Sequence, residues 1–160
     1  GDNGYRTALI GKWHLGYLQK HHPMNFGFQK FVGFKSGNVD YQSHRNRYGD
    51  MDWWDGLEMK DMSGYTTTLL TTLSEDYIKE NKDKPFCLYI AHAAPHSPMQ
   101  GPDEKAVRTE ATPEGDKNSD RSNKEIYKDM VEEPLWCLCS KEKILLQGFY
   151  FGVMVIRLYQ

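Results

Sequence analysis

The clearest periodic pattern in the chain lies at residues 66–81. Apolar side chains recur there every three or four residues, which places them on one face of an α-helix. An asparagine at the end of this range can serve the C-terminal cap, and the proline that follows at 85 prevents continuation. The pattern predicts an amphipathic helix whose apolar face carries Leu69, Leu70, Leu73, Tyr77 and Ile78.

Two short segments predict strands. Residues 5–10 form the first strand, and we expect Gly11 to end it. Residues 86–91 form a continuous apolar run of six after the predicted helix, which is typical of a strand buried on both faces of a parallel sheet. The alternation of strand, helix and strand predicts an α/β architecture with a parallel sheet.

The remaining segments have weaker patterns. Residues 21–61 show no clean period, so we predict a long structured loop region, and such loops are usually functional when they are ordered. Residues 103–120 are charged and predict a solvated surface segment. Ser122 and Glu125 have the spacing of a capping box, which predicts a second helix that Pro134 should stop.

An apolar stretch near the C-terminus covers residues 144–156, between Lys143 and Arg157. Its 13 residues fall short of the roughly 17 that a membrane-spanning helix needs. We therefore expect a buried strand or a short buried helix rather than an anchor. The mean hydropathy of −0.72 also argues against an integral membrane protein, and we predict no membrane span.

Composition narrows the possible partners. The 160 residues suffice for one ordinary domain, and the formal charge of −2 leaves no basic excess that would recruit nucleic acid. Three cysteines, at 87, 137 and 139, cannot build a disulfide framework, and no histidine near the last two completes a zinc site. We predict no nucleic-acid partner and no metal site formed by this chain.

Basic side chains follow both predicted strands. Lys12 and His14 come just after the first, and His92 and His96 come just after the second. Ligands in open α/β sheets bind beyond the carboxyl ends of strands, and cationic groups there suit an oxyanion such as sulfate, phosphate or carboxylate. Taken singly, Lys12 and His14 could be a surface lysine and a capping histidine, and His92 could be a packing histidine. The two clusters together predict an oxyanion site.

Three other patterns are less specific. The spacing of His92 and His96 would suit a helical zinc site, but prolines at 95 and 98 would break that helix. The triplet at residues 2–4, Asp-Asn-Gly, could supply a metal ligand, although turn formation suits it better. Residues 36–45 place polar groups near Trp53 and Trp54, which suits a sugar ring, and a merely structured polar loop explains them equally well.

Residues 4–16, GYRTALIGKWHLG, closely resemble the second signature of the type I sulfatases, G-Y-x-T-x-x-x-G-K-x-H. Residues 85–102 resemble the later strand and A-P-H-x-P loop of that family, and residues 25–34 resemble the G-F-x-x-F-x-G-F stretch between them. The resemblance covers residues 1–133 in matching order. It implies an arylsulfatase-like, alkaline-phosphatase-like α/β domain with a central, largely parallel sheet, here only as a fragment.

The resemblance also implies a reaction, the hydrolysis of a sulfate ester, and we expect a sulfated carbohydrate as substrate. Members of the family use a formylglycine, made from a C/S-x-P/A-x-R motif, whose hydrate attacks sulfur while a calcium ion holds the sulfate oxygens. By that likeness Lys12 would contact the sulfate and the formylglycine. His14 would hydrogen-bond the formylglycine hydroxyl, and His96 would donate a proton at the leaving-group oxygen.

Further roles follow from the same likeness. Ser36 is a weaker candidate for a sulfate contact, and Asp40 and His44 would face the substrate in the pocket. The C/S-x-P/A-x-R motif, the metal aspartates, the Asp-Asn pair and the second lysine of the family do not occur in this sequence. We therefore expect Ca²⁺ and formylglycine to belong to a full-length parent. The chain, which does not begin with Met, would be an internal fragment that is inactive and holds no calcium tightly by itself.

The likeness to the family stops abruptly at residue 134. We predict a partial catalytic domain at 1–133 and a divergent tail at 134–160, and we hypothesise that a frameshift, a retained intron or an exon boundary produced this tail. A genuine divergent end is the alternative. The family also suggests a secreted, periplasmic or lysosomal location.

Two other functions stay open. A phosphodiesterase or phosphonate hydrolase of the same superfamily would use Lys12 and His14 equally well, because phosphoryl oxygens need the same donors. The chain could also be a non-catalytic remnant or a module that binds sulfated glycans, with Arg45 and Arg47 contributing charge and with salt-sensitive binding.

Overall fold

A computed structural model describes residues 4–113, 120–139, 147–150 and 153–158, with side chains described up to residue 133. The predicted turn at residues 2–4 lies almost wholly outside the described residues. The elements are β1 (Arg6–Lys12), η1 (Gln19–His21), η2 (Pro23–Phe26), β2 (Lys30–Phe34), β3 (Trp54–Asp55), β4 (Glu58–Met59), α1 (Thr66–Asn81), β5 (Phe86–Ala91), α2 (Asn123–Cys139), β6 (Gln147–Tyr150) and β7 (Val153–Leu158).

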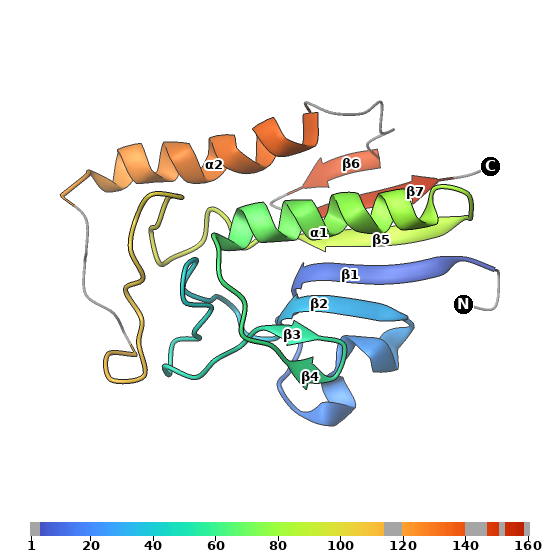
Figure 1. Ribbon diagram of the computed structural model, residues 1–160, viewed down its shortest axis with the longest axis horizontal. Helices are drawn as coiled ribbons and strands as arrows, with labels where there is room; N and C mark the ends of the chain where they lie inside the picture. Colours follow the sequence, from blue (N-terminus) through green and yellow to red (C-terminus); the bar gives the residue numbers. More distant parts are fainter. Residues whose placement is uncertain (1–3, 114–119, 140–146, 151–152, 159–160) are drawn as a thin grey trace.

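The described strands form one sheet in the order β4-β3-β2-β1-β5-β7-β6 (Figure 1). Its centre is parallel, because β1 pairs with β2 on one side and with β5 on the other in the same direction. The outer pairs, β2 with β3 and β5 with β7, are antiparallel. The prediction of an α/β fold with a largely parallel sheet is confirmed for this centre, and the sheet as a whole is mixed.

The register of the parallel strands brings their carboxyl ends to one edge. Lys12 lies opposite Phe34 of β2, and Gly11 lies opposite Ala91 of β5. Gly11 has φ +118°, and a Cβ at this position would overlap the carbonyl oxygen of Ala91. Glycine here lets β5 approach closely while the strand runs on to Lys12. The prediction that Gly11 ends the strand is therefore wrong.

Helix α1 has the bounds that its periodicity predicts, and it packs against β1, β5 and α2. Leu70, Tyr77 and Ile78 join the hydrophobic core, whereas Leu69 and Leu73 are only partly buried. The buried face also carries hydroxyl groups that donate within the helix, for example from Ser74 Oγ to the carbonyl of residue 70 at 2.6 Å. These bonds satisfy polar groups that burial would otherwise leave without a partner.

The region 21–61 is less irregular than its pattern predicts, because it contains β2 beside the central strand. This strand has only five residues, and Gly33 interrupts its apolar run. A Cβ at Gly33 would overlap the carbonyl oxygen of Gly11. Gly33 therefore weakens the strand pattern in the sequence, and the same glycine allows β2 to pair closely with β1.

The second helix begins as predicted but ends later. Glu125 Oε2 accepts from the Ser122 N–H at 2.9 Å, and Ser122 Oγ accepts from the Glu125 N–H at 3.3 Å, which confirms the capping box. The prediction that Pro134 stops the helix is wrong, because α2 continues to Cys139. A proline inside a helix removes one backbone hydrogen bond without always ending the helix. Of the two structures predicted within residues 144–156, the strand is observed, as parts of β6 and β7.

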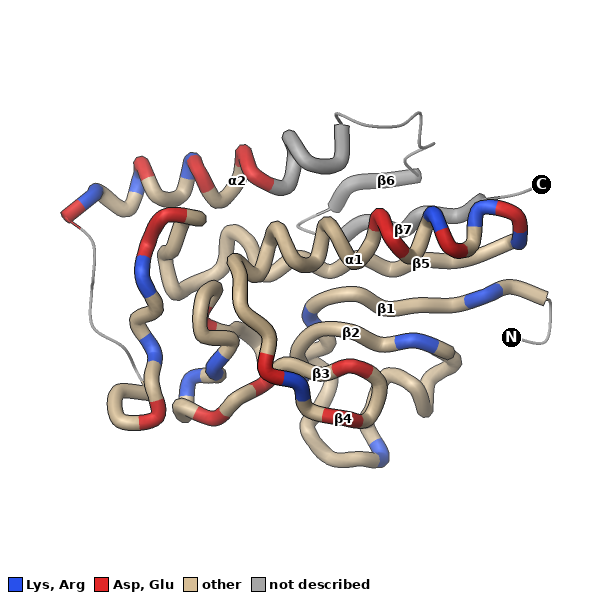
Figure 2. Tube along the Cα trace, viewed as in Figure 1, with Lys and Arg blue, Asp and Glu red and all other residues tan. Residues whose placement is uncertain are grey.

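Charged residues avoid the middle of the sheet (Figure 2). In the three central strands β2, β1 and β5, Lys and Arg lie only at the ends of β1 and at the start of β2, and β5 has no charged residue, whereas acidic and basic residues alternate along α2. The only charges that the central strands bring to their carboxyl edge are therefore basic. Within the described part of the chain, no helix combines the length and apolar character needed to cross a membrane.

Candidate functional site

The segment that follows β1 is held against the segment that follows β2. The N–H of Trp13 donates to the carbonyl of Phe34 at 2.9 Å, and the N–H of His14 donates to that of Lys35 at 3.1 Å. The indole Nε1 of Trp13 donates to the His21 carbonyl at 2.7 Å, which ties down the start of the loop. These bonds place Lys12 and His14 at the carboxyl edge of the sheet, as predicted.

His96 reaches the same edge from the loop after β5. Its N–H donates to the carbonyl of Ala93 at 2.9 Å, and the hydroxyl of Tyr41 donates to the carbonyl of His96 at 2.9 Å. Its ring Nδ1 lies 2.9 Å from the Ser97 carbonyl oxygen and 3.3 Å from the Asn38 side-chain nitrogen. The Ser97 carbonyl can only accept, which needs a proton on Nδ1, whereas the Asn38 amide nitrogen can only donate, which needs a bare Nδ1; the shorter contact, to Ser97, favours the protonated Nδ1. Nε2 is then the nitrogen that can exchange a proton with a ligand.

Two pockets meet at His96. The larger, of about 420 Å³, is lined by Lys12 and by residues 91–96, which form the last residue of β5 and the loop after it. The smaller, of about 290 Å³, is lined by His14, His96 and the turn Ser36–Asn38. The three predicted catalytic residues, Lys12, His14 and His96, therefore come together around two adjoining pockets, and neither pocket has an Asp or Glu among its described lining residues.

The electrostatics of this edge favour an anion. Burial is the main factor that lowers the pKa of His14, and the nearby positive charges of Lys12 and His96 lower it further. Burial also lowers the pKa of Lys12. The positive charges of Lys12 and His96 therefore disfavour the charged form of His14, across a space without a described carboxylate. A bound oxyanion would relieve that repulsion and stabilise their charged forms.

Ser36 lines the smaller pocket, and its hydroxyl group already donates a hydrogen bond within the protein. It is buried, its Oγ donates to the carbonyl of Asn38 at 2.8 Å, and its N–H donates to Asp52 Oδ2 at 2.8 Å. The other carboxylate oxygen of Asp52 accepts from the N–H of Lys35 at 3.1 Å. Asp52 therefore shapes the turn, and Ser36 lines the smaller pocket with its hydroxyl proton committed to the turn itself.

Asp40 and His44 line neither of the two pockets at this sheet edge, contrary to expectation. Both side chains are 0% exposed. The two carboxylate oxygens of Asp40 accept five hydrogen bonds from neighbouring loops, and His44 Nε2 lies 3.0 Å from the carbonyl of Gly64 while its ring packs on Trp53. Asp40 and His44 therefore hold neighbouring loops together through hydrogen bonds that satisfy their buried polar atoms.

The two tryptophans predicted to contact a sugar ring, Trp53 and Trp54, also lie away from the two pockets. Trp53 is fully buried, and Trp54 lies beneath the ammonium group of Lys35 at 3.5 Å, so neither ring lines the two pockets. The aromatic residues that line the smaller pocket are Tyr17 and Tyr48, which are 52% and 66% exposed. Their only sequence signal was their place in the two loops that flank the predicted site.

His92 belongs to the larger pocket, and sequence reasoning left its role open. It is 6% exposed, and neither ring nitrogen has a hydrogen-bond partner among the described residues. Burial lowers the pKa of His92 to about 4, so the ring is neutral at pH 7. The alternative of a packing histidine with one satisfied nitrogen does not describe it, because both nitrogens are buried and neither has a partner among the described residues.

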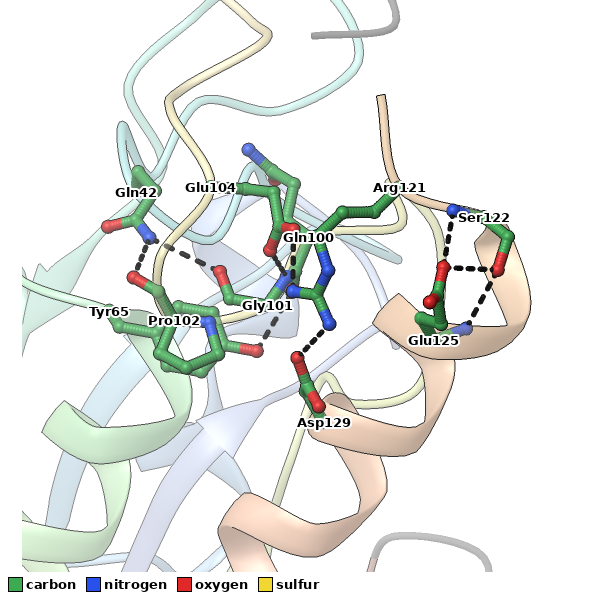
Figure 3. Close-up of polar contacts among 10 residues, drawn as sticks. All are labelled: Gln42, Tyr65, Gln100, Gly101, Pro102, Glu104, Arg121, Ser122, Glu125 and Asp129. Atoms are coloured by element: carbon green, nitrogen blue, oxygen red, sulfur yellow. Dashed lines mark hydrogen bonds and ion pairs between the residues drawn. The ribbon is translucent and has the colours of Figure 1, made fainter. Parts of the chain in front are cut away.

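The chain beyond His96 is fastened to the start of α2 (Figure 3). Arg121 lies between Glu104 and Asp129 with contacts of 3.0 and 2.6 Å, and Glu104 also accepts from the N–H of Gly101. One residue earlier, the carbonyl of Gln100 accepts from the Tyr65 hydroxyl at 2.9 Å. These contacts fix the end of the loop that carries His96, so α2 helps to position that histidine.

Calcium ligands are scarce in the described part of the chain. No group of three or more His, Cys, Asp or Glu side chains there could hold a metal ion. The two buried carboxylates nearest the site, Asp40 and Asp52, are occupied by N–H donors, as described above. The described residues therefore do not fit a calcium site of their own.

Comparisons with known proteins agree with this geometry. The profile of the Sulfatase family matches residues 1–135. Mouse arylsulfatase J is 33% identical over 115 residues, which cover 62% of this chain and 18% of that protein. The N-acetylglucosamine-6-O-sulfatase of Bacteroides thetaiotaomicron is 33% identical over 94 residues, which cover 58% of this chain and 15% of that protein. The chain thus spans less than a fifth of the length of these relatives.

A solved structure shares the fold as well. The crystal structure of Ps i-CgsB in complex with k-i-k-neocarrahexaose superposes with a TM-score of 0.66 and 26% identity, and the match covers 86% of this chain and 33% of that one. The sheet edge with its lysine and histidines, the family profile and this likeness agree. The chain belongs to the sulfatase family, and its fold is that of the alkaline-phosphatase-like sulfatases.

Proposed function

We propose that this chain forms the sulfate-binding edge of a sulfatase, an enzyme that hydrolyses sulfate esters. One observation carries the proposal, which is the meeting of Lys12, His14 and His96 around two adjoining pockets without a described carboxylate. A sulfate monoester needs donors for its oxygens and an acid for its leaving group. The three side chains are of the types that supply these functions.

Each residue has a distinct role in this proposal. Lys12 at the end of β1 binds the sulfate oxygens, since burial removes competing water from around its charge. His14 donates to an oxygen on the opposite side of the group. His96 donates a proton from Nε2 to the leaving-group oxygen, while Nδ1 stays on the Ser97 carbonyl and keeps the ring oriented. Ser36 supports the turn and makes at most a secondary contact with the sulfate.

Formylglycine and calcium supply the nucleophile and further charge stabilisation in the sulfatase family generally. The 160-residue sequence contains no C/S-x-P/A-x-R motif, and its described residues do not fit a calcium site. We propose that sulfate-ester hydrolysis is the activity of a longer protein, and that the 160-residue chain alone binds the sulfate group without turnover.

The substrate class in this proposal is a sulfated carbohydrate. One relative is an N-acetylglucosamine-6-O-sulfatase, and one structural neighbour is in complex with a neocarrahexaose. Tyr17 and Tyr48 at the smaller pocket offer exposed aromatic faces of the kind that pack against sugar rings. These observations support a glycan substrate more than a small aromatic sulfate.

The test measures binding of galactose 6-sulfate to the 160-residue chain by calorimetry, with galactose as the neutral control. We expect Lys12→Ala to weaken binding about tenfold or more, because a charge-assisted contact is lost. Lys20→Ala, which removes an exposed lysine from η1, is the matched control. Equal affinity for galactose and galactose 6-sulfate, or binding that Lys12→Ala leaves unchanged, would refute the proposal. Tighter binding of galactose 6-phosphate would favour the phosphodiesterase alternative.

A further inference from the structure

The smaller pocket continues past His14 and His96 to a patch that the sulfate-binding role does not use. Tyr17, Arg47 and Tyr48 line this outer end. Tyr17 comes from the loop after β1, and the other two come from the long loop between β2 and β3. All three side chains are exposed in the described structure, so the patch is open to a ligand.

Positive charge is concentrated at this patch. The Arg47 guanidinium carbon lies 5.6 Å from the centre of the Tyr48 ring, which holds the charge over an aromatic face. A second guanidinium lies close behind, where Arg108 Nη1 donates to the Asn38 side-chain oxygen at 2.9 Å. Burial lowers the pKa of Arg108, the negative charge of Asp40 raises it, and the positive charge of Arg47 lowers it further.

The charge of Arg47 is not neutralised by a described ion pair. No salt bridge to Arg47 occurs among the described residues, and neither Asp nor Glu lines the smaller pocket there. Arg108 is different, because the neighbouring Asp40 compensates its charge, yet its Nε is buried and has no partner within the same part of the structure. A planar guanidinium beside an aromatic ring is suited to bind a carboxylate or sulfate with two parallel hydrogen bonds.

We propose that Tyr17, Arg47 and Tyr48 form a subsite for a second anionic group, so that the preferred substrate is a glycan with another sulfate or a carboxylate near the scissile sulfate ester. The sugar ring that carries the scissile group would lie beside His96 and against the two tyrosines. Arg47 would then bind the second anion on the same ring or on the next one. This inference rests on the proposed function, because it assumes that the first sulfate occupies the site of Lys12, His14 and His96.

The test compares three probes on the 160-residue chain by calorimetry at fixed ionic strength. They are galactose 6-sulfate, galactose 2,6-disulfate, and galactose 6-sulfate joined to glucuronate. We expect at least one doubly anionic probe to bind about tenfold more tightly than the singly sulfated sugar. The preferred probe identifies the second group as sulfate or carboxylate.

The variants assign this gain to Arg47. Arg47→Gln should bring the ratio between doubly and singly anionic probes to about one, and Arg47→Lys should restore part of the ratio, because lysine keeps the charge without the planar fork. Arg6→Gln is the control, since Arg6 is an exposed arginine at the opposite end of β1 from Lys12. Thermal unfolding of each variant checks that the fold is retained, and the lysine variant can replace the glutamine variant if the latter does not fold.

The outcomes separate the two proposals. Suppose that galactose 6-sulfate binds and Lys12→Ala weakens it, but a second anion adds nothing or Arg47→Gln keeps the gain. The subsite is then refuted while the sulfate site stands. If no probe binds more tightly than galactose, both proposals are refuted. A ratio that falls equally in the Arg6→Gln control would also refute the subsite, because it would indicate attraction to net charge alone.

Discussion

Replacement of Asp40 tests the distinction between a residue that holds loops and one that touches substrate. Its Oδ1 accepts from the backbone N–H groups of Gln42 and Ser43 at 2.9 and 2.8 Å. Its Oδ2 accepts from the N–H groups of Val107 and Arg108 at 2.7 and 2.8 Å, and from the Gln100 side chain at 3.1 Å. One side chain therefore joins two segments more than 60 residues apart in the sequence.

The magnitude follows from what would be left without an acceptor. Each buried donor that loses its partner destabilises the folded state by about 1–3 kcal/mol. Water can reach some of the donors in Asp40→Ala, so we expect a total loss of about 4 kcal/mol rather than the full sum. Asp40→Asn keeps the shape of the side chain and one acceptor oxygen, but it turns an amide N–H₂ toward other donors. We expect this variant to lose about 2 kcal/mol of folding stability. Losses of this size are a large part of the stability of a small domain.

The assay is urea unfolding followed by tryptophan fluorescence, because Trp53 is fully buried in the same loop region. Asp50→Asn, at an exposed aspartate nearby, is the matched control and should change stability by less than about 0.5 kcal/mol. The reasoning would be refuted if Asp40→Asn unfolded at the wild-type urea concentration while losing affinity for galactose 6-sulfate. That result would mean that Asp40 contacts the ligand after all.

Three further substitutions test other parts of the structure. In Gly37→Ala the new Cβ would lie 2.5 Å from His14 Nε2, so the histidine ring must move. We expect the affinity for galactose 6-sulfate to fall about tenfold with little change in melting temperature. An unchanged affinity would contradict this. Gly11→Ala should destabilise the fold by about 3 kcal/mol in thermal unfolding, because its Cβ would overlap the Ala91 carbonyl; a wild-type melting temperature would contradict the close strand approach. Burial lowers the pKa of His92 to about 4, so the unfolded chain binds more protons between pH 6.5 and 4, and stability should fall by up to about 3 kcal/mol as the pH falls through this range. His92→Leu should remove that part of the pH dependence in urea titrations, and an unchanged slope would show that His92 is not its source.

Local patterns predicted the elements whose signals are local. The three- and four-residue spacing of apolar residues predicted α1 with its observed bounds, and a six-residue apolar run predicted β5. The capping box predicted the start of α2, because both of its hydrogen bonds lie within four residues. By contrast β2 was missed, since its identity depends on pairing with β1, which lies almost 20 residues earlier.

The candidate site shows the same division. The expectation that Lys12, His14 and His96 lie together followed from the rule that parallel strands end at one edge, and the observed register places them there. Asp40 and His44 were expected in the pocket because of the resemblance to the sulfatase family. Residue type does not indicate direction, and both side chains point inward to donors and aromatic rings from other loops.

The sequence by itself determined the helix α1, the strands β1 and β5, the basic groups at their ends and the resemblance to sulfatases, because these depend on neighbours in the chain or on short motifs. Only the tertiary structure decided which polar residues are buried and which face the pockets. In that structure Asp40, His44 and Trp53 are buried, and both nitrogens of His92 lack a described partner. Arg47 lies with the two tyrosines that line the smaller pocket. The physical reason is that burial and electrostatic repulsion are properties of contacts between distant segments, and no local pattern specifies those contacts.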